Sequence, residues 1–408
     1  MRAWLRDTAG GLSATYWYLW TGLLINKVGG FAILFLSLYL TSQRGAGTAQ
    51  AGLIVGTYGI GGLLGSLTGG VLTDRWGRRR TLLTSHFTTV AALLALAFSS
   101  DLVMIAVWCA LLGVAQSMAS PAFVAAIIDV TPAEKRSRAF NLQFWALNLG
   151  LAGASLLAGL LAQWSYVGLF LIDGACTLVT GILIAWKVPE TLRTPSSPSR
   201  PRAGGLGTVL TDRIFLVFVG LTLLQALIYA QSNTIVPLAM HADGLSPAAY
   251  GSVVALGGAL IVLGQLFVPR LIDGHRKHRV LALALLVDGV GFGVLAFADH
   301  LAWYLLAAAI WTVGSMLAAP PNAEINSELA PLALRGRYQA VFFLTFPAAS
   351  FLAPSVGGAG LQYLGDAHWV VVGVLGALAA GLHLLAGRPR ERRVAAIRDE
   401  TSAVAEVS

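Results

Sequence analysis

Charged side chains are scarce in this sequence, because Asp, Glu, Lys and Arg make up only 11% of its 408 residues. A soluble globular domain carries about 25% charged residues. Hydrophobic residues make up 56% of the chain, and its mean hydropathy is +0.74. This balance excludes an ordinary soluble domain and indicates that lipid surrounds most of the folded protein.

Cysteine and the usual catalytic motifs are also scarce. The two cysteines, Cys109 and Cys176, both lie in apolar stretches, which argues against a disulfide framework. The sequence has no H-E-x-x-H, no G-x-S-x-G, no nucleotide-binding loop and no Cys/His metal spacing, so nothing points to catalysis. We therefore expect no enzyme activity, no catalytic residues, no cofactor, no bound metal and no nucleic-acid partner.

Long apolar runs are abundant and are separated by short polar breaks. A membrane-spanning helix needs about 20 mostly apolar residues, and backbone groups in hydrocarbon must bond within their own segment. The runs therefore predict an all-α integral membrane protein with twelve transmembrane helices. The expected spans are 15–40, 49–72, 80–99, 102–125, 138–163, 166–186, 212–240, 248–270, 279–298, 301–324, 336–363 and 367–387.

The basic residues are distributed unevenly around these spans. Apart from Lys27 and Arg44, all of the 27 Lys and Arg residues fall at the N-terminus, in the loops after every second span, or in the C-terminal tail. Basic loops stay on the cytoplasmic side of a membrane. The net charge of +8 therefore reports topology, and both termini are expected to be cytoplasmic.

The sequence also repeats itself at one constant offset of 199 residues. That offset brings Asp74 onto Asp273, Arg80 onto Arg279 and Pro121 onto Pro320, and these residue types are scarce here. Two six-helix halves in the same orientation follow. We expect an N-terminal bundle (1–187), a cytoplasmic linker (188–210) rich in Pro, Ser, Arg and Gly, a C-terminal bundle (211–387) and a polar cytoplasmic tail (388–408).

The stretch "GGVLTDRWGRRR" after the second span carries a family resemblance. It fits G-x-x-x-D-R-x-G-R-R-R from Gly70 to Arg80, and a worn copy, "PRLIDGHRKHR", follows the eighth span. Together with "VPET" after the sixth span and the internal repeat, it resembles the loop signature of the major facilitator superfamily. The resemblance covers nearly the whole chain and implies that family's fold of two six-helix repeats.

The resemblance also implies a role for this loop as a conformational latch. Asp74 would face the start of the eleventh span across the two halves, and Arg78 would pair with Asp129 at the end of the fourth. Asp74 could also meet the positive N-terminus of a helix there. The alternative is that some of these arginines, Arg79 and Arg80 above all, only fix topology. The residues expected in the latch are Gly70, Asp74, Arg75, Gly77, Arg78 and Asp129.

Two departures from the family pattern bear on coupling. The Gly-rich kink that the family's exporters often carry in the fifth span is degraded here and is better kept in the eleventh, as "APSVGG". The Arg that proton-linked members often carry in the fourth span corresponds to Cys109. A proton relay through that Arg cannot operate in this chain.

Ionisable residues within the spans are candidates for coupling, because a charge at membrane depth costs at least ~2.5 kcal/mol and usually faces a cavity or a partner. These residues are Lys27, Asp173, Asp288 and Glu324. The resemblance places the first, fourth, seventh and tenth spans around the cavity, which favours Lys27 and Glu324, followed by Asp288. The alternative for each is a structural pair.

Neutral polar and aromatic residues predict the lining of a substrate cavity. Asn26 and Gln225 occupy the same position in the two repeats. Aromatic rings give contact area and amides orient a bound molecule, although the amides could also bond between helices. The expected lining residues are Asn26, Gln225, Tyr229, Trp145, Asn148, Trp311 and Asn322.

These features predict a secondary active transporter of the bacterial cytoplasmic membrane that works by alternating access. We expect a monomer that exports small amphipathic organic compounds, in the manner of multidrug efflux, in exchange for protons. A proton symporter or facilitator importing a sugar, organic acid or amino acid is the alternative. A receptor or scaffold on the same fold is a third reading.

Overall fold

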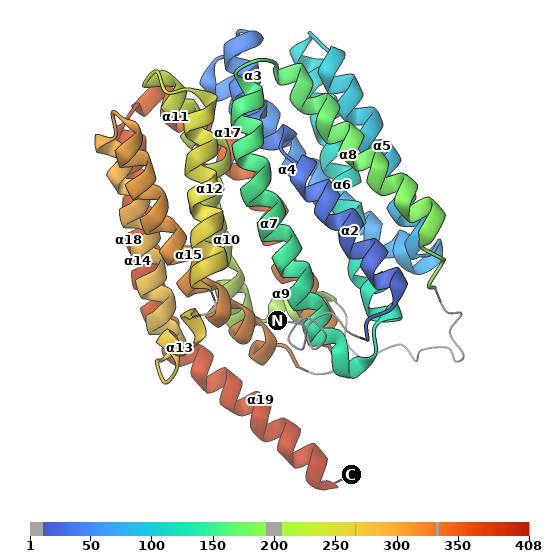
Figure 1. Cartoon of the computed structure of the whole chain (residues 1–408). Helices are drawn as coiled ribbons and strands as arrows, with labels where there is room; N and C mark the ends of the chain where they lie inside the picture. Colours follow the sequence, from blue (N-terminus) through green and yellow to red (C-terminus); the bar gives the residue numbers. More distant parts are fainter. Residues whose placement is uncertain (1–10, 193–205, 266, 332–333, 408) are drawn as a thin grey trace.

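The computed structural model describes residues 11–192, 206–265, 267–331 and 334–407, which form a bundle of long helices (Figure 1). Twelve spans among them are long and apolar enough to cross a membrane, which confirms the predicted number. The first half contains α2 (Ala14–Gly29), α3 (Ala32–Gln43), α4 (Thr48–Arg75), α5 (Arg78–Phe98), α6 (Leu102–Val130), a turn of 3₁₀ helix η1 (Ala133–Lys135), α7 (Arg136–Ala162) and α8 (Tyr166–Lys187).

The second half repeats this order after a short helix, α9 (Leu206–Thr211), which lies in the predicted linker. Residues 193–205 of that linker lie outside the described residues. The helices of the second half are α10 (Arg213–Thr234), α11 (Val236–Ala242), α12 (Pro247–Gly264), α13 (Val268–Ile272), α14 (Lys277–Val294), η2 (Leu295–Phe297), α15 (Leu301–Leu329), α16 (Arg335–Phe343), α17 (Thr345–Leu364) and α18 (Ala367–Leu385).

Most span boundaries agree with the sequence to within a few residues. Helices α6 and α15 continue to Val130 and Leu329, beyond the expected ends at 125 and 324. Each contains proline, at Pro121 and Pro320 respectively, and both helices continue past it. Helix α12 ends at Gly264, earlier than expected.

The first span contains a break that the sequence did not predict. Gly30 ends α2, and α3 begins at Ala32 without a side-chain cap from Phe31. The Ala32 N–H donates a hydrogen bond of 3.2 Å to Oδ2 of Asp173 on α8. A carboxylate satisfies an otherwise unpaired N–H and opposes the positive end of the helix dipole. Asp173 therefore stabilises the restart of the helix.

The two halves contact each other only in part along their length. One end of the bundle holds the start of α2 and the last residue of α18, and we call this end the basic face. We call the other end the opposite face. In Figure 1 the basic face lies below. Helix α4 packs on α17 near the opposite face, where a Cβ at Gly52 would lie 3.1 Å from Gly358 Cα. Helix α7 packs on α12 at the same level, where a Cβ at Gly251 would lie 2.6 Å from the Ser155 oxygen.

Toward the basic face α4 contacts its own half instead. A Cβ at Gly69 would lie 2.7 Å from Met118 Cα on α6, so the glycines of α4 let two backbones approach closely. One apolar core, with Phe35, Tyr250 and Ile235 among its members, joins both halves at the opposite face. The cores at the basic face are separate for each half. The bundle is therefore closed at the opposite face and open at the basic face.

The polar tail forms a helix, α19 (Gly387–Val407), below the bundle (Figure 1). Arg390 anchors it, because its guanidinium donates to the carbonyl oxygens of Ala386 and His383, each at 3.1 Å. The Arg390 residue is only 4% exposed, and this burial lowers the pKa of its guanidinium to about 10. The tail therefore adds a packed element to the second half.

Candidate functional site

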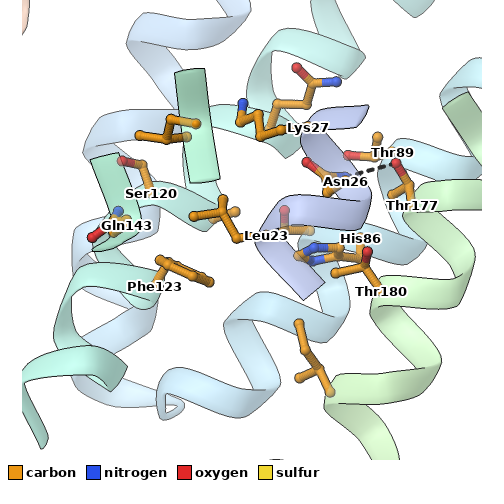
Figure 2. A pocket seen from close by; sticks show the side chains of 15 residues that line it. Leu23, Asn26, Lys27, His86, Thr89, Ser120, Phe123, Gln143, Thr177 and Thr180 are labelled. Atoms are coloured by element: carbon orange, nitrogen blue, oxygen red, sulfur yellow. Dashed lines mark hydrogen bonds between the residues drawn. The ribbon is translucent and has the colours of Figure 1, made fainter. Parts of the chain in front are cut away.

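A polar cavity of about 200 Å³ lies inside the first half (Figure 2). Asn26 and Lys27 reach it from α2, Ser120 and Phe123 from α6, and Gln143 from α7. The Asn26 amide donates a hydrogen bond of 3.0 Å to the Thr177 hydroxyl on α8. The cavity is lined mainly by amides and hydroxyls, and its one formally charged side chain is Lys27.

Lys27 stands at the break in the first span. Helix α7 passes so close that a Cβ at Gly150 would lie 2.5 Å from Lys27 Cβ. The stem of the side chain is therefore held between two helices, while Lys27 as a whole is exposed to the open space of the cavity. Among the described residues, Lys27 has no carboxylate within ion-pair distance.

A second cavity, of about 610 Å³, lies in the second half. Gln225 and Tyr229 reach it from α10, Asn322 from α15, and phenylalanines from α16 and α17. The Asn322 amide donates a hydrogen bond of 2.8 Å to Gln225 Oε1. Three phenylalanines, Phe342, Phe343 and Phe346, give this cavity a mainly apolar wall.

The two cavities occupy equivalent places in the repeats. The constant offset of the sequence relates Asn26 to Gln225, and both residues line their cavities. It also relates Gln143 to Phe342, so an aromatic ring in the second cavity takes the place of an amide in the first. Lys27 corresponds to an alanine. The repeat therefore builds one polar, cationic cavity and one aromatic cavity.

Three expected lining residues lie elsewhere. Trp311 is 4% exposed and stacks on Phe292 with ring centroids 4.8 Å apart, because its ring turns toward α14 and away from the cavity. Trp145 is half exposed and does not line either cavity. The Asn148 amide donates 2.8 Å to the Phe144 carbonyl within its own helix. The sequence shows which residues share a face of a helix, but it does not show whether that face meets a cavity or a neighbouring helix.

Asp288 lies directly behind the wall of the second cavity. It is fully buried, and its Oδ1 accepts a hydrogen bond of 3.3 Å from the Ser315 hydroxyl. Ser315 in turn lines the cavity. Gly314 makes room for the carboxyl group, since a Cβ there would lie 2.8 Å from Asp288 Cγ. The second carboxyl oxygen is buried and has no hydrogen-bond partner among the described residues.

At the basic face of the first half, Arg78 and Asp129 meet as the resemblance implied. Arg78 Nε lies 2.9 Å from Asp129 Oδ2, and Arg78 Nη1 donates to the Thr73 carbonyl at 3.1 Å. The Arg78 side chain is only 16% exposed. These contacts link the end of α4, the start of α5 and the end of α6 within one half.

Glu190 and Thr191 of "VPET" also belong to this cluster, although the sequence did not predict it. Glu190 accepts hydrogen bonds from the backbone N–H groups of Arg78 (2.8 Å) and Arg79 (3.2 Å), which begin α5. The Thr191 hydroxyl donates to Asp129 at 3.0 Å. Gly77 makes this possible, because its φ is +103° and a side chain there would strike the Glu190 carboxylate. The feature of the sequence that could have predicted these contacts is the acidic residue followed by a hydroxyl residue, directly after the sixth span.

The remaining latch residues are open to solvent in this conformation. The Asp74 side chain is 80% exposed, and its nearest cation is Arg78 Nη1 at 3.9 Å. Arg75 is exposed, and nothing lies within 4 Å of a Cβ at Gly70. Tyr338, at the expected partner helix, instead donates 2.9 Å to Asp212. Among the side chains that the structure describes, Asp74 forms no hydrogen bond or ion pair with the start of α16.

Glu324 lies at the basic face of the second half, where it lines a small cavity of about 220 Å³ beside Lys277 and neither of the two cavities described above. Lys277 Nζ lies 2.8 Å from Glu324 Oε2 and 2.8 Å from Glu328 Oε2. The constant offset relates Lys277 to Arg78 and Glu328 to Asp129. The worn copy of the loop therefore keeps the same ion pair as the first half.

Comparisons with known proteins agree with this architecture. A model of the Major Facilitator Superfamily matches residues 19–354 and 232–406. "Uncharacterized MFS-type transporter YhjO" of Bacillus subtilis is 28% identical over 370 residues, covering 89% of this chain and 90% of that protein. "Na(+), Li(+), K(+)/H(+) antiporter" of Planococcus maritimus is 24% identical, covering 78% and 83%. "Multidrug resistance protein MdtH" of Aeromonas salmonicida is 24% identical, covering 88% and 92%.

A solved structure shares the fold. The crystal structure of the peptide transporter POT in complex with sulfate superposes with a TM-score of 0.79, covering 95% of this chain and 96% of that one. The two sequences are 16% identical, so the likeness shows the arrangement of helices alone.

Proposed function

The chain belongs to the major facilitator superfamily, and we propose that it exports small amphipathic organic compounds in exchange for protons. It is a multi-pass cell-membrane transporter and not an enzyme. The proposal concerns the substrate, the direction of transport and the coupling ion. The pair of unlike cavities carries it.

The cavities support a substrate with a polar part and an apolar part. Related halves place their substrate sites near the bilayer midplane at the repeat interface. One cavity offers amides and hydroxyls around Asn26, and the other offers the rings of Tyr229, Phe342 and Phe346. A molecule that spans the two would match both surfaces. A uniformly polar substrate would leave the aromatic wall unused.

The open basic face indicates which conformational change would follow in a transport cycle. The distribution of Lys and Arg predicts that the basic face is cytoplasmic, so a bundle open at that face is inward-facing. Rocking of the two halves would close the basic face and open the other. Asp74 would then meet the start of α16, and its contact there would favour the outward-facing state. The resemblance to MdtH supports loading from the cytoplasm and release outside.

Of the three expected coupling residues, Asp288 has the geometry that best suits proton exchange. It is fully buried, and its hydrogen bond to Ser315 connects it to the cavity wall. A buried carboxyl group without a cationic partner is a costly place for a lasting charge. Glu324 is held by Lys277 outside both cavities, and Lys27 lines the other cavity. The similarity to a cation/H⁺ antiporter supports proton exchange.

Reconstituted vesicles test the proposal. The full chain is placed in proteoliposomes with a pH-sensitive dye inside, and a fluorescent amphipathic dye is added as the transported probe. We expect the probe to move against a proton gradient and to drive proton flow in the other direction. The Asp288→Asn variant should lose the proton flow, and Asp299→Asn, an exposed acid at the opposite face, should keep it. Probe movement together with protons would contradict export and support the symporter.

A further inference from the structure

The linings of the two cavities contain a cationic side chain but no carboxylate. Lys27 is in the first cavity, and the second has no charged residue among its lining residues. A cationic substrate would therefore find aromatic faces and amides but no opposite charge. An anionic one would find Lys27. Sequence composition alone does not reveal this asymmetry, because Asp173 and Asp288 also fall within spans.

The acid on the neighbouring helix is already engaged elsewhere. Asp173 is 2% exposed, and its Oδ2 accepts from the Ala32 N–H at 3.2 Å. Its Oδ1 accepts from the Thr177 hydroxyl at 3.5 Å. One oxygen thus accepts a hydrogen bond from the start of α3, and the other accepts one from within α8. In the part of the chain that the structure describes, no ion pair joins Asp173 to Lys27. The Lys27 ammonium is left facing the cavity.

The unpaired ammonium is informative because Lys27 lies within a membrane span. A charge at membrane depth is costly and usually faces a cavity or a partner. Helix α7 packs Gly150 against the base of the Lys27 side chain. A side chain that is held at membrane depth without a protein partner is best explained by a partner that comes and goes.

The second cavity supplies the complementary surface. Phe343 is 59% exposed and Phe346 is 47% exposed, and both face the cavity that Phe342 also lines. Exposed rings give large apolar contact area to a bound molecule. The offset makes Phe342 and Phe346 the equivalents of Gln143 and Leu147, which line the first cavity. A ligand held at Lys27 by its charge could pack its body here.

We propose that the substrate is an amphipathic organic anion whose carboxylate binds Lys27 and whose apolar body packs on Phe342, Phe343 and Phe346. This inference rests on the proposed transport function and narrows its substrate class. Rocking of the halves would carry both binding surfaces together. The site is selective by charge, because a cation of the same shape would meet the Lys27 ammonium.

A matched set of three probes tests the charge preference. Phenylbutyrate, phenylbutanol and phenylbutylamine share one apolar body and differ only in a negative, neutral or positive head. Each is titrated against the purified full chain while thermal unfolding is followed, because a ligand that binds the folded form raises its apparent stability. We expect phenylbutyrate to bind at least about tenfold more tightly than the other two.

Variants identify the residue responsible. Lys27→Met should remove the preference for phenylbutyrate, a loss of about tenfold or more in its affinity, and Lys27→Arg should restore part of it. Lys187→Met makes the same change at an exposed lysine that ends α8, and it should keep the preference. Equal binding of all three probes, stronger binding of the amine, no binding of the acid, or a preference that survives Lys27→Met would each overturn the inference.

The same variants separate this inference from the proposed function. If the vesicle assay shows proton-driven export but the amine binds best, the substrate class is wrong and export stands. If phenylbutyrate binds through Lys27 but enters vesicles together with protons, the anion site stands and export is wrong.

Discussion

The two halves of this protein build the same ion pair at the basic face from loops of very different quality. Arg78 lies 2.9 Å from Asp129 in the first half, and Lys277 lies 2.8 Å from Glu328 in the second. The first loop keeps every fixed position of the family signature, whereas the second has lost its glycines. Charge pairing therefore survives without the rest of the signature.

In addition to its ion pair, the first half has a side chain that caps the start of α5 through backbone hydrogen bonds. Glu190 accepts the N–H groups that begin α5, and Gly77 admits it by taking a φ of +103°. The position equivalent to Gly77 is Arg276, whose φ is −66° and which does not cap α14 with its side chain. The second half instead uses Glu391 of α19, 2.9 Å from His278 Nδ1. Gly77 of the signature thus permits the capping of α5, which the ion pair alone does not provide.

The cavities differ between the halves in the same way. The repeat keeps the position of each cavity but exchanges amide for ring and lysine for alanine. Divergence of the two copies therefore gives the substrate site two chemically different walls. Each prediction below changes equivalent positions in both halves.

The largest effect is expected for Gly77→Ala. The positive φ costs a non-glycine residue on the order of 1–3 kcal/mol, and the new Cβ would displace the Glu190 carboxylate. We expect a loss of about 3 kcal/mol in stability and a clear fall in the melting temperature of the purified protein. Arg276→Ala, the equivalent change, should leave that temperature almost unaltered. Equal destabilisation by both would remove the asymmetry argued above.

Loss of the carboxylate from each ion pair should reduce the stability of the protein by different amounts in the two halves. Asp129→Asn leaves the mostly buried Arg78 without its carboxylate, which is expected to cost about 2 kcal/mol. Glu328→Gln leaves Lys277 with Glu324 at 2.8 Å, so its cost is expected to be below about 1 kcal/mol. Thermal unfolding of the two variants and of the wild type measures the difference. A larger loss for Glu328→Gln would show that the second half depends more on its ion pair.

The amide pairs of the cavities give a smaller effect. Gln225→Leu takes the acceptor from the Asn322 amide, and an unmade buried hydrogen bond is expected to cost about 1 kcal/mol, or roughly a fivefold rise in KM for a substrate that contacts it. Asn26→Leu leaves Thr177 its hydrogen bond to Asp173, so a rise of about twofold is expected. KM measured in vesicles tests both. A larger effect of Asn26→Leu would place the main polar contact in the first half.

The smallest effect on stability is expected for Asp74→Asn. The carboxylate is 80% exposed and only 3.9 Å from Arg78 Nη1, so the melting temperature should change by less than the equivalent of about 0.5 kcal/mol. The transport rate should nevertheless fall, because the outward-facing state would lose its contact with α16. Asp273→Asn is the matched control and should keep the rate. An unchanged rate for Asp74→Asn would contradict the latch.

Much of the architecture could be predicted from the sequence. The number of spans follows from hydropathy and length alone, and α4, α8 and α18 begin and end within a few residues of their expected limits. The pairing of Arg78 with Asp129 followed from the family resemblance. The break at Gly30 could not be predicted, because Asp173 stabilises it from a helix far away in the sequence. The placement of Trp311 against Phe292 was missed for the same reason.

Composition and spacing along the chain dictate which segments enter the membrane, that these segments form two copies of one unit, and which few residues carry charge. These are properties of local composition, so no partner is needed to fix them. Other outcomes arise from the packing of distant helices: Lys27 faces a cavity, Asp173 supports a helix end, and Glu190 caps α5 behind Gly77. Those outcomes depend on distances between helices, which packing of the whole bundle sets.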